Sequence, residues 1–298
     1  MKKVLITGAY GFAGANLTEH MAKKGYRVMA VGRKDSPHNS RCSGLDNVIG
    51  ITADMEEYGA LPDKLKEAGE DHVDAVIHLA WGGDRKDMSR QVKNLLPSLE
   101  LMEAAGKLGA SRFIGIGSQA EYGERSEVLT EDLTPDPLDA YGACKTAAFY
   151  LLRDKAATLG IDFIWGRIFS LIGRYEPSGR MLPDLCRRLK AGESMKLSSC
   201  TQYWDYLDAA DAAAAITALL EKGHPGEIYN ICHGEYMPLK QFTGRAAAFF
   251  GADENLITYG DKARPFISLQ SSSEKLRRDT GWEPVVTFEE SIKKYDII

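Results

Sequence analysis

The stretch that decides the fold is residues 2–16, KKVLITGAYGFAGAN. Residues 4–6 form an apolar run that predicts a strand, and residues 15–24 have the composition of a helix. Between them stand three glycines at the spacing G-x-x-G-x-x-G, namely Gly8, Gly11 and Gly14. The stretch therefore predicts a strand, a glycine-rich turn and the start of a helix.

Such a turn forms a cradle for phosphate, because the first N–H groups of a helix lack partners and the helix dipole favours an anion. Gly8 permits the tight turn, Gly11 lets a pyrophosphate approach the backbone, and Gly14 lets helix and strand pack closely. A glycine triplet also occurs in turns that bind nothing, and a purely structural turn is the alternative. The position between a strand and a helix favours the phosphate cradle.

Downstream of this turn, apolar strand patterns alternate with helical patterns. Strands are predicted at residues 26–31, 48–53, 75–79, 112–116 and 163–168, and the longest helices at 92–108 and 141–159. This alternation indicates βαβ units and a parallel sheet covered on both faces. We expect an α/β Rossmann domain, a doubly wound parallel sheet that binds a dinucleotide, at residues 1–168.

The regular alternation ends near residue 173. Helices are predicted at 183–190, 209–221, 239–250 and 273–280, with short strand-like pieces such as 227–231 between them. We expect residues 169–298 to form mainly a smaller C-terminal α/β substrate-binding cap, with some segments returning to the first domain. The cap is expected at the carboxyl edge of the sheet, where open α/β sheets bind ligands.

The composition indicates which classes of partner and which cellular compartment to expect for the protein. The chain has 298 residues, a net charge of −5 and no cluster of basic residues, which argues against nucleic acid and membrane surfaces as partners. No apolar run is long enough to span a bilayer, and we expect a cytoplasmic protein. The odd number of dispersed cysteines indicates reduced thiols, with neither a disulfide framework nor a metal site: Cys42, Cys144, Cys186, Cys200 and Cys232.

The residues after the predicted second strand indicate which dinucleotide the protein prefers. Dinucleotide folds often place an acidic residue there for the ribose 2′-hydroxyl, but this chain has Gly32, Arg33 and Lys34. A cationic fork suits a 2′-phosphate better than a hydroxyl, so we expect NADP, with NAD as the alternative. A solvated basic turn with no ligand is the other interpretation.

A tyrosine and a lysine four residues apart mark the candidate chemistry. Tyr141 and Lys145 share one face near the start of a predicted helix, and a nearby cation is expected to lower the pKa of the phenol toward neutrality. Tyr141 is then a plausible proton donor or acceptor for a carbonyl/alcohol pair. Ser118 follows the predicted fifth strand, and its hydroxyl either bonds the same substrate oxygen or only forms a turn.

Together these motifs resemble the extended short-chain dehydrogenase/reductase family of nucleotide-sugar epimerases, dehydratases and reductases. The matching segments run nearly the length of the chain. They are TGAYGFAG at 7–14, Asp54, HLAW at 78–81, Asn94, GSQAEYG at 117–123, YGACK at 141–145, GEIYNICHGE at 226–235 and GWEP at 281–284.

The resemblance implies a role for each matched position. Tyr141 is the acid/base and Ser118 its partner, Lys145 holds the nicotinamide ribose and tunes Tyr141, and Asn94 supports a proton relay. The implied cofactor-binding residues are Gly8, Gly11, Phe12, Gly14, Arg33, Asp54 at the adenine, Met55, Leu79, Ala80 at the middle of the cofactor, and Lys145. The implied substrate-binding residues are Ser170, Trp204 and Arg264.

Departures from the family pattern reduce the number of reactions that the protein is expected to catalyse. Dehydratases of this family carry an Asp-Glu pair where this chain has Gln119 and Ala120, which cannot exchange protons. An arginine that holds the substrate diphosphate is replaced by Trp204, which is either a core aromatic or a stacking surface, and Arg264 is then the remaining phosphate ligand. Trp81 replaces a small residue beside the cofactor, and the sequence gives no reason for it.

We therefore expect an NAD(P)-dependent enzyme that reduces a 4-keto group of a nucleotide-activated sugar. The alternative is a nucleotide-sugar 4-epimerase, and a non-catalytic dinucleotide-binding sensor is the competing class. A homodimer is expected through the helices at 92–108 and 141–159. His78 is interpreted as a hydrogen-bonded core histidine and Cys144 as helix filler.

Overall fold

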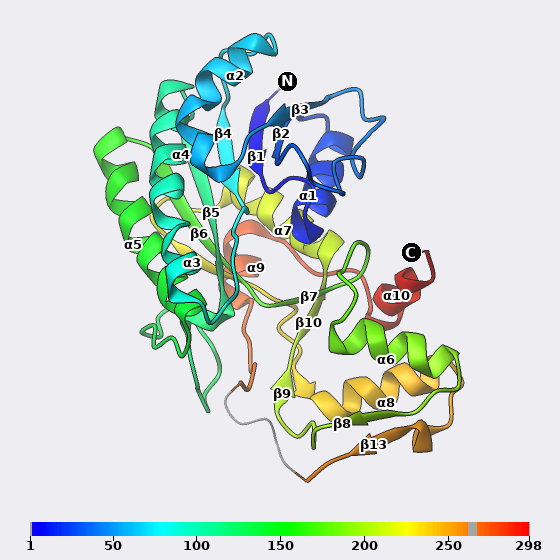
Figure 1. Cartoon of the computed structure of the whole chain (residues 1–298). Helices are drawn as coiled ribbons and strands as arrows, with labels where there is room; N and C mark the ends of the chain where they lie inside the picture. Colours follow the sequence, from blue (N-terminus) through cyan, green and yellow to red (C-terminus); the bar gives the residue numbers. More distant parts are fainter. Residues whose placement is uncertain (1, 262–266, 298) are drawn as a thin grey trace.

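A parallel sheet of seven strands forms the centre of the larger lobe in the computed structural model, which describes residues 2–261 and 267–297 (Figure 1). The strand order is β11-β6-β5-β4-β1-β2-β3, and every neighbouring pair is parallel. The strands are β1 (Lys3–Thr7), β2 (Arg27–Gly32), β3 (Val48–Thr52), β4 (Ala75–His78), β5 (Arg112–Ser118), β6 (Asp162–Ile168) and β11 (Ile228–Ile231). The order reverses direction between β1 and β4, and such a switch point is where this type of sheet binds its ligand.

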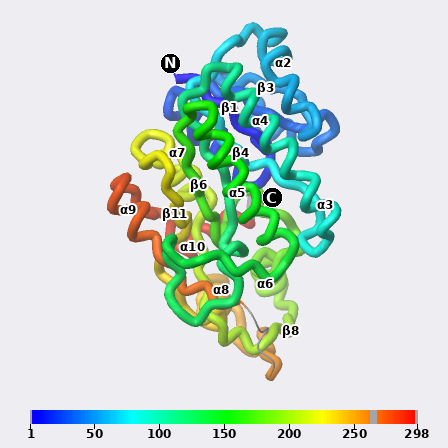
Figure 2. Tube along the Cα trace, turned by 90° about the vertical axis from the view of Figure 1, so that its left-hand side faces the viewer, coloured from blue at the N-terminus to red at the C-terminus, as the bar shows by residue number. Residues whose placement is uncertain are grey.

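Helices cover both faces of the sheet (Figures 1 and 2). One face carries α1 (Phe12–Lys23), α7 (Ala209–Lys222) and α9 (Glu274–Thr280). The other carries α2 (Leu61–Glu67), α4 (Leu95–Lys107) and the long α5 (Ala140–Leu159), with the short α3 (Met88–Val92) beside α5. Three-residue to six-residue 3₁₀ turns connect some of these elements, including η1 (Met55–Ala60) and η2 (Gln119–Glu121).

Alternating side chains of β1 show how the apolar strands form two cores. Val4 and Ile6 are fully buried in the cluster that contains α1 and α7 side chains, such as Leu17. Leu5, between them, is fully buried in the cluster on the opposite face, with Leu152 of α5. A strand buried on both faces in this way has a continuous apolar sequence, as residues 4–6 do.

A smaller lobe lies at the carboxyl end of the sheet (Figure 1). It has its own core, in which Leu185, Phe242, Phe288 and Ile292 are buried together. Its elements are β7 (Ser170–Ile172), α6 (Met181–Lys190), β8 (Met195–Leu197), β9 (Tyr203–Trp204), β10 (Tyr206–Asp208), β12 (Met237–Pro238), α8 (Leu239–Phe249), η3 (Glu254–Leu256), β13 (Ile257–Tyr259), α10 (Phe288–Lys293) and η4 (Lys294–Ile297).

The expected fold class, a doubly wound parallel sheet with a smaller lobe, is confirmed. β11 and α7 come from the C-terminal half yet pack in the larger lobe, and the division at residue 168 stays a prediction. The helix expected at 92–108 is present as α4, but it begins at Leu95, because the chain breaks between α3, which ends at Val92, and α4. The Asn94 side chain donates to the Arg90 and Gln91 carbonyls at 3.3 and 3.0 Å, and these bonds close α3 at the break.

The glycine-rich turn has the geometry that its sequence predicts. Gly8 has φ +68°, and a Cβ there would lie 2.9 Å from the Ala80 nitrogen. A Cβ on Gly14 would lie 2.0 Å from the Gly8 carbonyl oxygen, so α1 can approach the turn only with glycine at this position. Gly11 is the N-cap of α1 and supplies no side chain to the first turn of the helix.

All five cysteines lie in the described part of the chain, where they are buried and form no disulfide. Within the described part of the chain, no helix combines enough length and enough hydropathy to cross a membrane.

The close approach of Gly14 to Gly8 can be tested by substitution. We expect Gly14→Ala to destabilise the protein by about 1–3 kcal/mol, because the added methyl group forces the helix and the turn apart. The matched control is Gly244→Ala in α8, where no described atom lies within 4 Å of the added Cβ. Helix propensity predicts that this control is neutral or stabilising. Urea unfolding of both variants measures the difference, and an unchanged midpoint for Gly14→Ala would contradict the packing described here.

Candidate active site

Three of the four expected catalytic side chains lie together at the carboxyl end of β5. Ser118 is the last residue of β5, and Tyr141 and Lys145 stand in the first two turns of α5, which packs along β5. Asp139 caps α5 by accepting a hydrogen bond from the Gly142 nitrogen at 2.8 Å. A Cβ on Gly142 would lie 2.4 Å from the Ala120 carbonyl oxygen, so this glycine lets the helix start close to η2.

Ser118 is held by a buried ion pair that sequence reasoning missed. Its backbone nitrogen donates to Glu121 Oε1 at 2.8 Å, while its own Oγ accepts from the Ala120 nitrogen at 3.2 Å. The Glu121 carboxylate also accepts from Arg167 Nε at 2.9 Å and from Trp165 Nε1 at 3.1 Å. Both charged side chains are almost completely buried, as a paired interior charge has to be. A glutamate as the single charged residue of the GSQAEYG segment was the available signal.

Lys145 carries its ammonium into the interior, where only 3% of the residue is exposed. Nζ donates to the Ile116 carbonyl oxygen at 2.6 Å and lies 3.8 Å from the centre of the Trp81 ring. Burial lowers the pKa of Lys145 to about 7, and the negative charge of Glu121 opposes that shift. The amine therefore titrates close to neutral pH.

Tyr141 differs from its sequence expectation. Burial raises the pKa of the Tyr141 phenol above its usual value, although a hydrogen bond to Ser118 and the charge of Arg85 both act to lower it. The expected lowering by Lys145 is wrong, since Nζ lies 6.0 Å from the Tyr141 ring centre and bonds to Ile116 instead. At neutral pH the phenol therefore keeps its proton and can donate it.

Arg85 is a second residue at this site that the sequence did not single out. Its guanidinium lies 4.4 Å from the centre of the Tyr141 ring, and it donates to Asp139 Oδ2 at 3.1–3.2 Å. The Arg85 carbonyl oxygen accepts from the Tyr141 nitrogen at 3.0 Å. The loop after β4 is thereby joined to the first turn of α5.

Two buried amides brace that loop. Asn94 accepts from the Gly82 nitrogen at 2.8 Å and donates to the Gly82 carbonyl oxygen at 3.1 Å. Gln91 accepts from Trp81 Nε1 at 2.7 Å and donates to the Asp84 carbonyl oxygen at 2.9 Å. Both side chains are thus engaged in fixing the loop, and the relay role of Asn94 stays a prediction.

The expected cofactor residues converge at the carboxyl edge of the sheet. The Leu79 nitrogen donates to the Thr7 carbonyl oxygen, and the Ala80 nitrogen lies 3.4 Å from Thr7 Oγ1. The turn after β1 and the loop after β4 are thereby in contact. Helix α1 begins at Phe12, directly after the glycine turn, so the unpaired N–H groups of its first turn lie close to the place where the turn contacts the loop after β4. The missing side chains at Gly8 and Gly14 let the turn pack closely on the loop after β4 and on α1, and a compact turn at a helix N-terminus fits the pyrophosphate of a dinucleotide.

The adjacent strand ends carry the remaining expected cofactor positions. Arg33 follows β2 with an exposed side chain, and Asp54 and the half-buried Met55 follow β3. Arg41, which the sequence analysis did not single out, donates from Nη1 to the Tyr10 carbonyl oxygen in the glycine turn at 3.1 Å. Two arginines therefore lie on this side of the candidate nucleotide site.

The expected substrate residues fall in the smaller lobe or outside the described residues. Ser170 begins β7 and is paired in register with Tyr206 of β10. Trp204 stands in β9, and its buried Nε1 has no hydrogen-bond partner among the residues described. Arg264 lies outside the described residues. The neighbouring Asp205 is buried and accepts from the His233 and Gly234 nitrogens and from Ser271 Oγ, so it holds loops together.

His78 ends β4 as a buried side chain bonded at both ring nitrogens, to Thr7 Oγ1 at 2.7 Å and to Ser98 Oγ at 2.9 Å. Burial and the charge of Lys145 lower its pKa to about 3. The ring is therefore neutral near pH 7, as expected for a core histidine.

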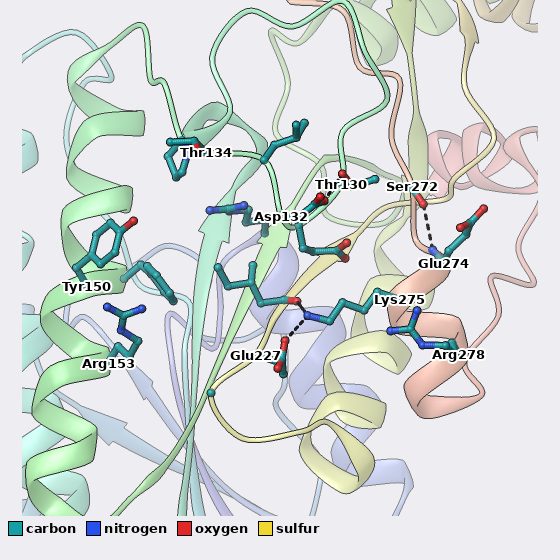
Figure 3. A pocket seen from close by; sticks show the side chains of 17 residues that line it. Thr130, Asp132, Thr134, Tyr150, Arg153, Glu227, Ser272, Glu274, Lys275 and Arg278 are labelled. Carbon is teal, nitrogen blue, oxygen red and sulfur yellow. Dashed lines mark hydrogen bonds and ion pairs between the residues drawn. The ribbon is translucent and has the colours of Figure 1, made fainter.

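A cavity of about 620 Å³ lies apart from this cluster, between α5, α9 and the start of β11 (Figure 3). Tyr150 and Arg153 line it from α5, and Lys275 lines it from α9. Lys275 is already engaged, since Nζ donates to Glu227 Oε2 and to the Ile228 carbonyl oxygen. Ser118, Tyr141 and Lys145 are not among the described residues that line this cavity, and we do not assign the chemistry to it.

The chain is similar to a family of known enzymes over most of its length. The model of the NAD dependent epimerase/dehydratase family matches residues 4–232. The chain is 27% identical to GDP-6-deoxy-D-mannose reductase of Pseudomonas aeruginosa, over 98% of this chain and 95% of the relative. It is 24% identical to UDP-glucose 4-epimerase of Corynebacterium glutamicum, over 95% of this chain and 91% of that one. The solved structure of RMD from Pseudomonas aeruginosa, complexed with NADPH, superposes with a TM-score of 0.80 at 26% identity, covering 99% of this chain and 98% of that chain.

Proposed function

The chain belongs to the NAD dependent epimerase/dehydratase family, and from that premise we propose that it reduces the 4-keto group of a nucleotide-activated sugar with NADPH. The observation that carries the proposal is the position of the Tyr141 phenol, hydrogen-bonded to Ser118 at the end of β5. A ketone that receives a hydride needs a proton at its oxygen, and a phenol that keeps its proton at neutral pH can supply it. The similarity to a reductase over nearly the whole chain supports the same reaction.

The bound nicotinamide supplies the hydride, and the protein supplies position and the proton. Ser118 Oγ accepts from the Ala120 nitrogen, and its O–H, which is bonded to Tyr141 in this structure, would turn to donate to the substrate carbonyl oxygen. Tyr141 gives its proton to that oxygen as the C–O double bond becomes a C–O single bond. Lys145 would hold the ribose of the cofactor through its ammonium group. The product of the reaction is the 4-hydroxy sugar.

Elimination is disfavoured at the same site. The residues after Ser118 are Gln119 and Ala120, and neither side chain can take or give a proton. The engaged catalytic cluster also argues against the dinucleotide sensor, which has no need of a buried lysine beside a tyrosine. A 4-epimerase remains the second candidate, because it uses the same three side chains and an epimerase is among the relatives.

The reaction is tested by stoichiometry. Incubation with a 4-keto nucleotide sugar and NADPH is expected to consume one NADPH for each 4-hydroxy sugar formed, as measured by absorbance and product analysis. Tyr141→Phe keeps the ring and removes the proton, so turnover is expected to fall about 10²–10⁴-fold while NADPH affinity is retained. Interconversion of 4-hydroxy epimers without net consumption of cofactor would reject the reductase in favour of the epimerase.

The NADPH preference rests on the exposed Arg33, because Arg33 and Lys34, and not a carboxylate, come directly after β2. A charge-assisted bond to the 2′-phosphate is worth about 1.5–3 kcal/mol, or roughly ten- to more than a hundredfold in affinity. Arg33→Ala is therefore expected to weaken NADPH by that factor and to leave NADH unchanged in calorimetric titration. Lys66→Ala, which removes one exposed charge from α2, serves as the control. Equal NADPH affinity of Arg33→Ala and the unsubstituted protein would show that Arg33 is only solvated.

A homodimer is part of the proposal. Large apolar side chains are exposed along α3, α4 and α5, which lie side by side in Figures 1 and 2: Met88, Val92, Leu96, Tyr150, Leu151 and Leu159. Exposed apolar side chains on neighbouring helices favour a protein interface. Light scattering is expected to give the dimer mass at micromolar concentration and the monomer mass for Leu96→Glu combined with Leu151→Glu. The control Val285→Glu alters an exposed apolar residue elsewhere, and a monomeric unsubstituted protein would reject the dimer.

A further inference from the structure

Trp81 is the bulky residue in the loop after β4 whose role sequence analysis leaves unexplained. The centre of its ring lies 3.8 Å from Lys145 Nζ, well inside the range of a cation–π contact. Its ring also meets the Tyr141 ring edge to face, with centres 6.4 Å apart and an interplanar angle of 88°. One indole thus contacts both members of the proposed acid/base pair.

A residue other than Tyr141 and Lys145 fixes the position of the Trp81 indole. Trp81 Nε1 donates to Gln91 Oε1 at 2.7 Å, and Gln91 is fully buried. The Gln91 amide donates in turn to the Asp84 carbonyl oxygen, so the loop and the ring are held by the same side chain. An indole anchored at its nitrogen presents its electron-rich face at a set place.

We propose that Trp81 is a positioning residue that holds the Lys145 ammonium in the active site through the face of its indole. This rests on the proposed function only in naming Lys145 and Tyr141 as the working pair. The Ile116 carbonyl oxygen offers Nζ a single hydrogen bond, and an ammonium has three donors. The aromatic face supplies a second attraction where water is excluded, and cation–π contacts gain strength when they are desolvated.

Glu121, His78 and Tyr141 are titratable groups near Lys145, and none of these three replaces the contact that Trp81 makes with the ammonium. Glu121 of η2 attracts the ammonium but already accepts bonds from Arg167, Trp165 and the Ser118 nitrogen. His78 of β4 is neutral at pH 7, because its pKa is lowered to about 3. Tyr141, on the same helix as Lys145, is protonated. The indole therefore stabilises the charged form of Lys145 without adding a charge of its own.

The test is a titration of Lys145 in the cofactor-free protein. Lysine labelled with ¹³C at Cε is followed by NMR from pH 5 to 10, and the Lys145 signal is assigned by its loss in Lys145→Met. The midpoint in the unsubstituted protein is expected near 7. Trp81→Leu removes the aromatic face and is expected to lower the midpoint by about one pH unit. Trp81→Phe restores a face and is expected to recover most of that shift.

A midpoint in Trp81→Leu equal to that of the unsubstituted protein, with Trp81→Leu folded by circular dichroism, would overturn the proposal and leave Trp81 a packing residue. If Trp81→Leu does not fold, fluorinated tryptophan placed at position 81 alone keeps the shape and weakens the ring face. The midpoint is then expected to fall with each added fluorine, and a constant midpoint would overturn the proposal. The titration uses no sugar and no cofactor, so its outcome is independent of the turnover assay that tests the reductase.

Discussion

The candidate active site depends on one constraint, the burial of the Lys145 ammonium. A charged group loses its hydration when it enters a protein interior, and the loss is tolerated only where other groups replace the water. Here the replacements come from three separate parts of the chain: the Ile116 carbonyl oxygen of β5, the Trp81 ring after β4 and the carboxylate of Glu121 in η2. Each of these fixes α5 against the sheet, and with it the Tyr141 phenol against Ser118.

A second buried charge pair supports Ser118 from the other side. Glu121 and Arg167 are joined at 2.9 Å inside the protein, and the same carboxylate holds the Ser118 nitrogen. Loss of either partner would leave an uncompensated charge in the interior, which is strongly destabilising. The same ion pair therefore stabilises the edge of the sheet where β5 and β6 end and holds the candidate catalytic serine in place there.

The sequence predicted those features that depend on local pattern. The strand, glycine turn and helix at residues 2–16 follow from neighbouring residues alone, and the spacing of Tyr141 and Lys145 places them on one helix face. It did not predict features that arise where distant segments meet. Glu121 meets Arg167 only after β5 and β6 pair, and Trp81 meets Lys145 only after the loop following β4 folds over α5.

One wrong expectation and one shifted helix boundary have the same origin. The pKa of Tyr141 was expected to fall because Lys145 is close in sequence, but the ammonium is drawn toward Ile116 and Trp81 while burial acts on the phenol. The break between α3 and α4 arises from the Asn94 side chain, which bonds to backbone groups that a continuous helix would use itself. Helical periodicity across residues 92–108 does not reveal this competition.

The central claim is that this cluster delivers a hydride from an exchangeable NADPH to a sugar carbonyl carbon, with the proton supplied by the protein. The most direct measurement is the fate of deuterium when the enzyme turns over a 4-keto nucleotide sugar with NADPH deuterated at the transferable position of C4. Mass spectrometry and NMR of the product are predicted to show one deuterium bonded to the former carbonyl carbon in every molecule. A product that carries no deuterium from the added NADPH would contradict the account.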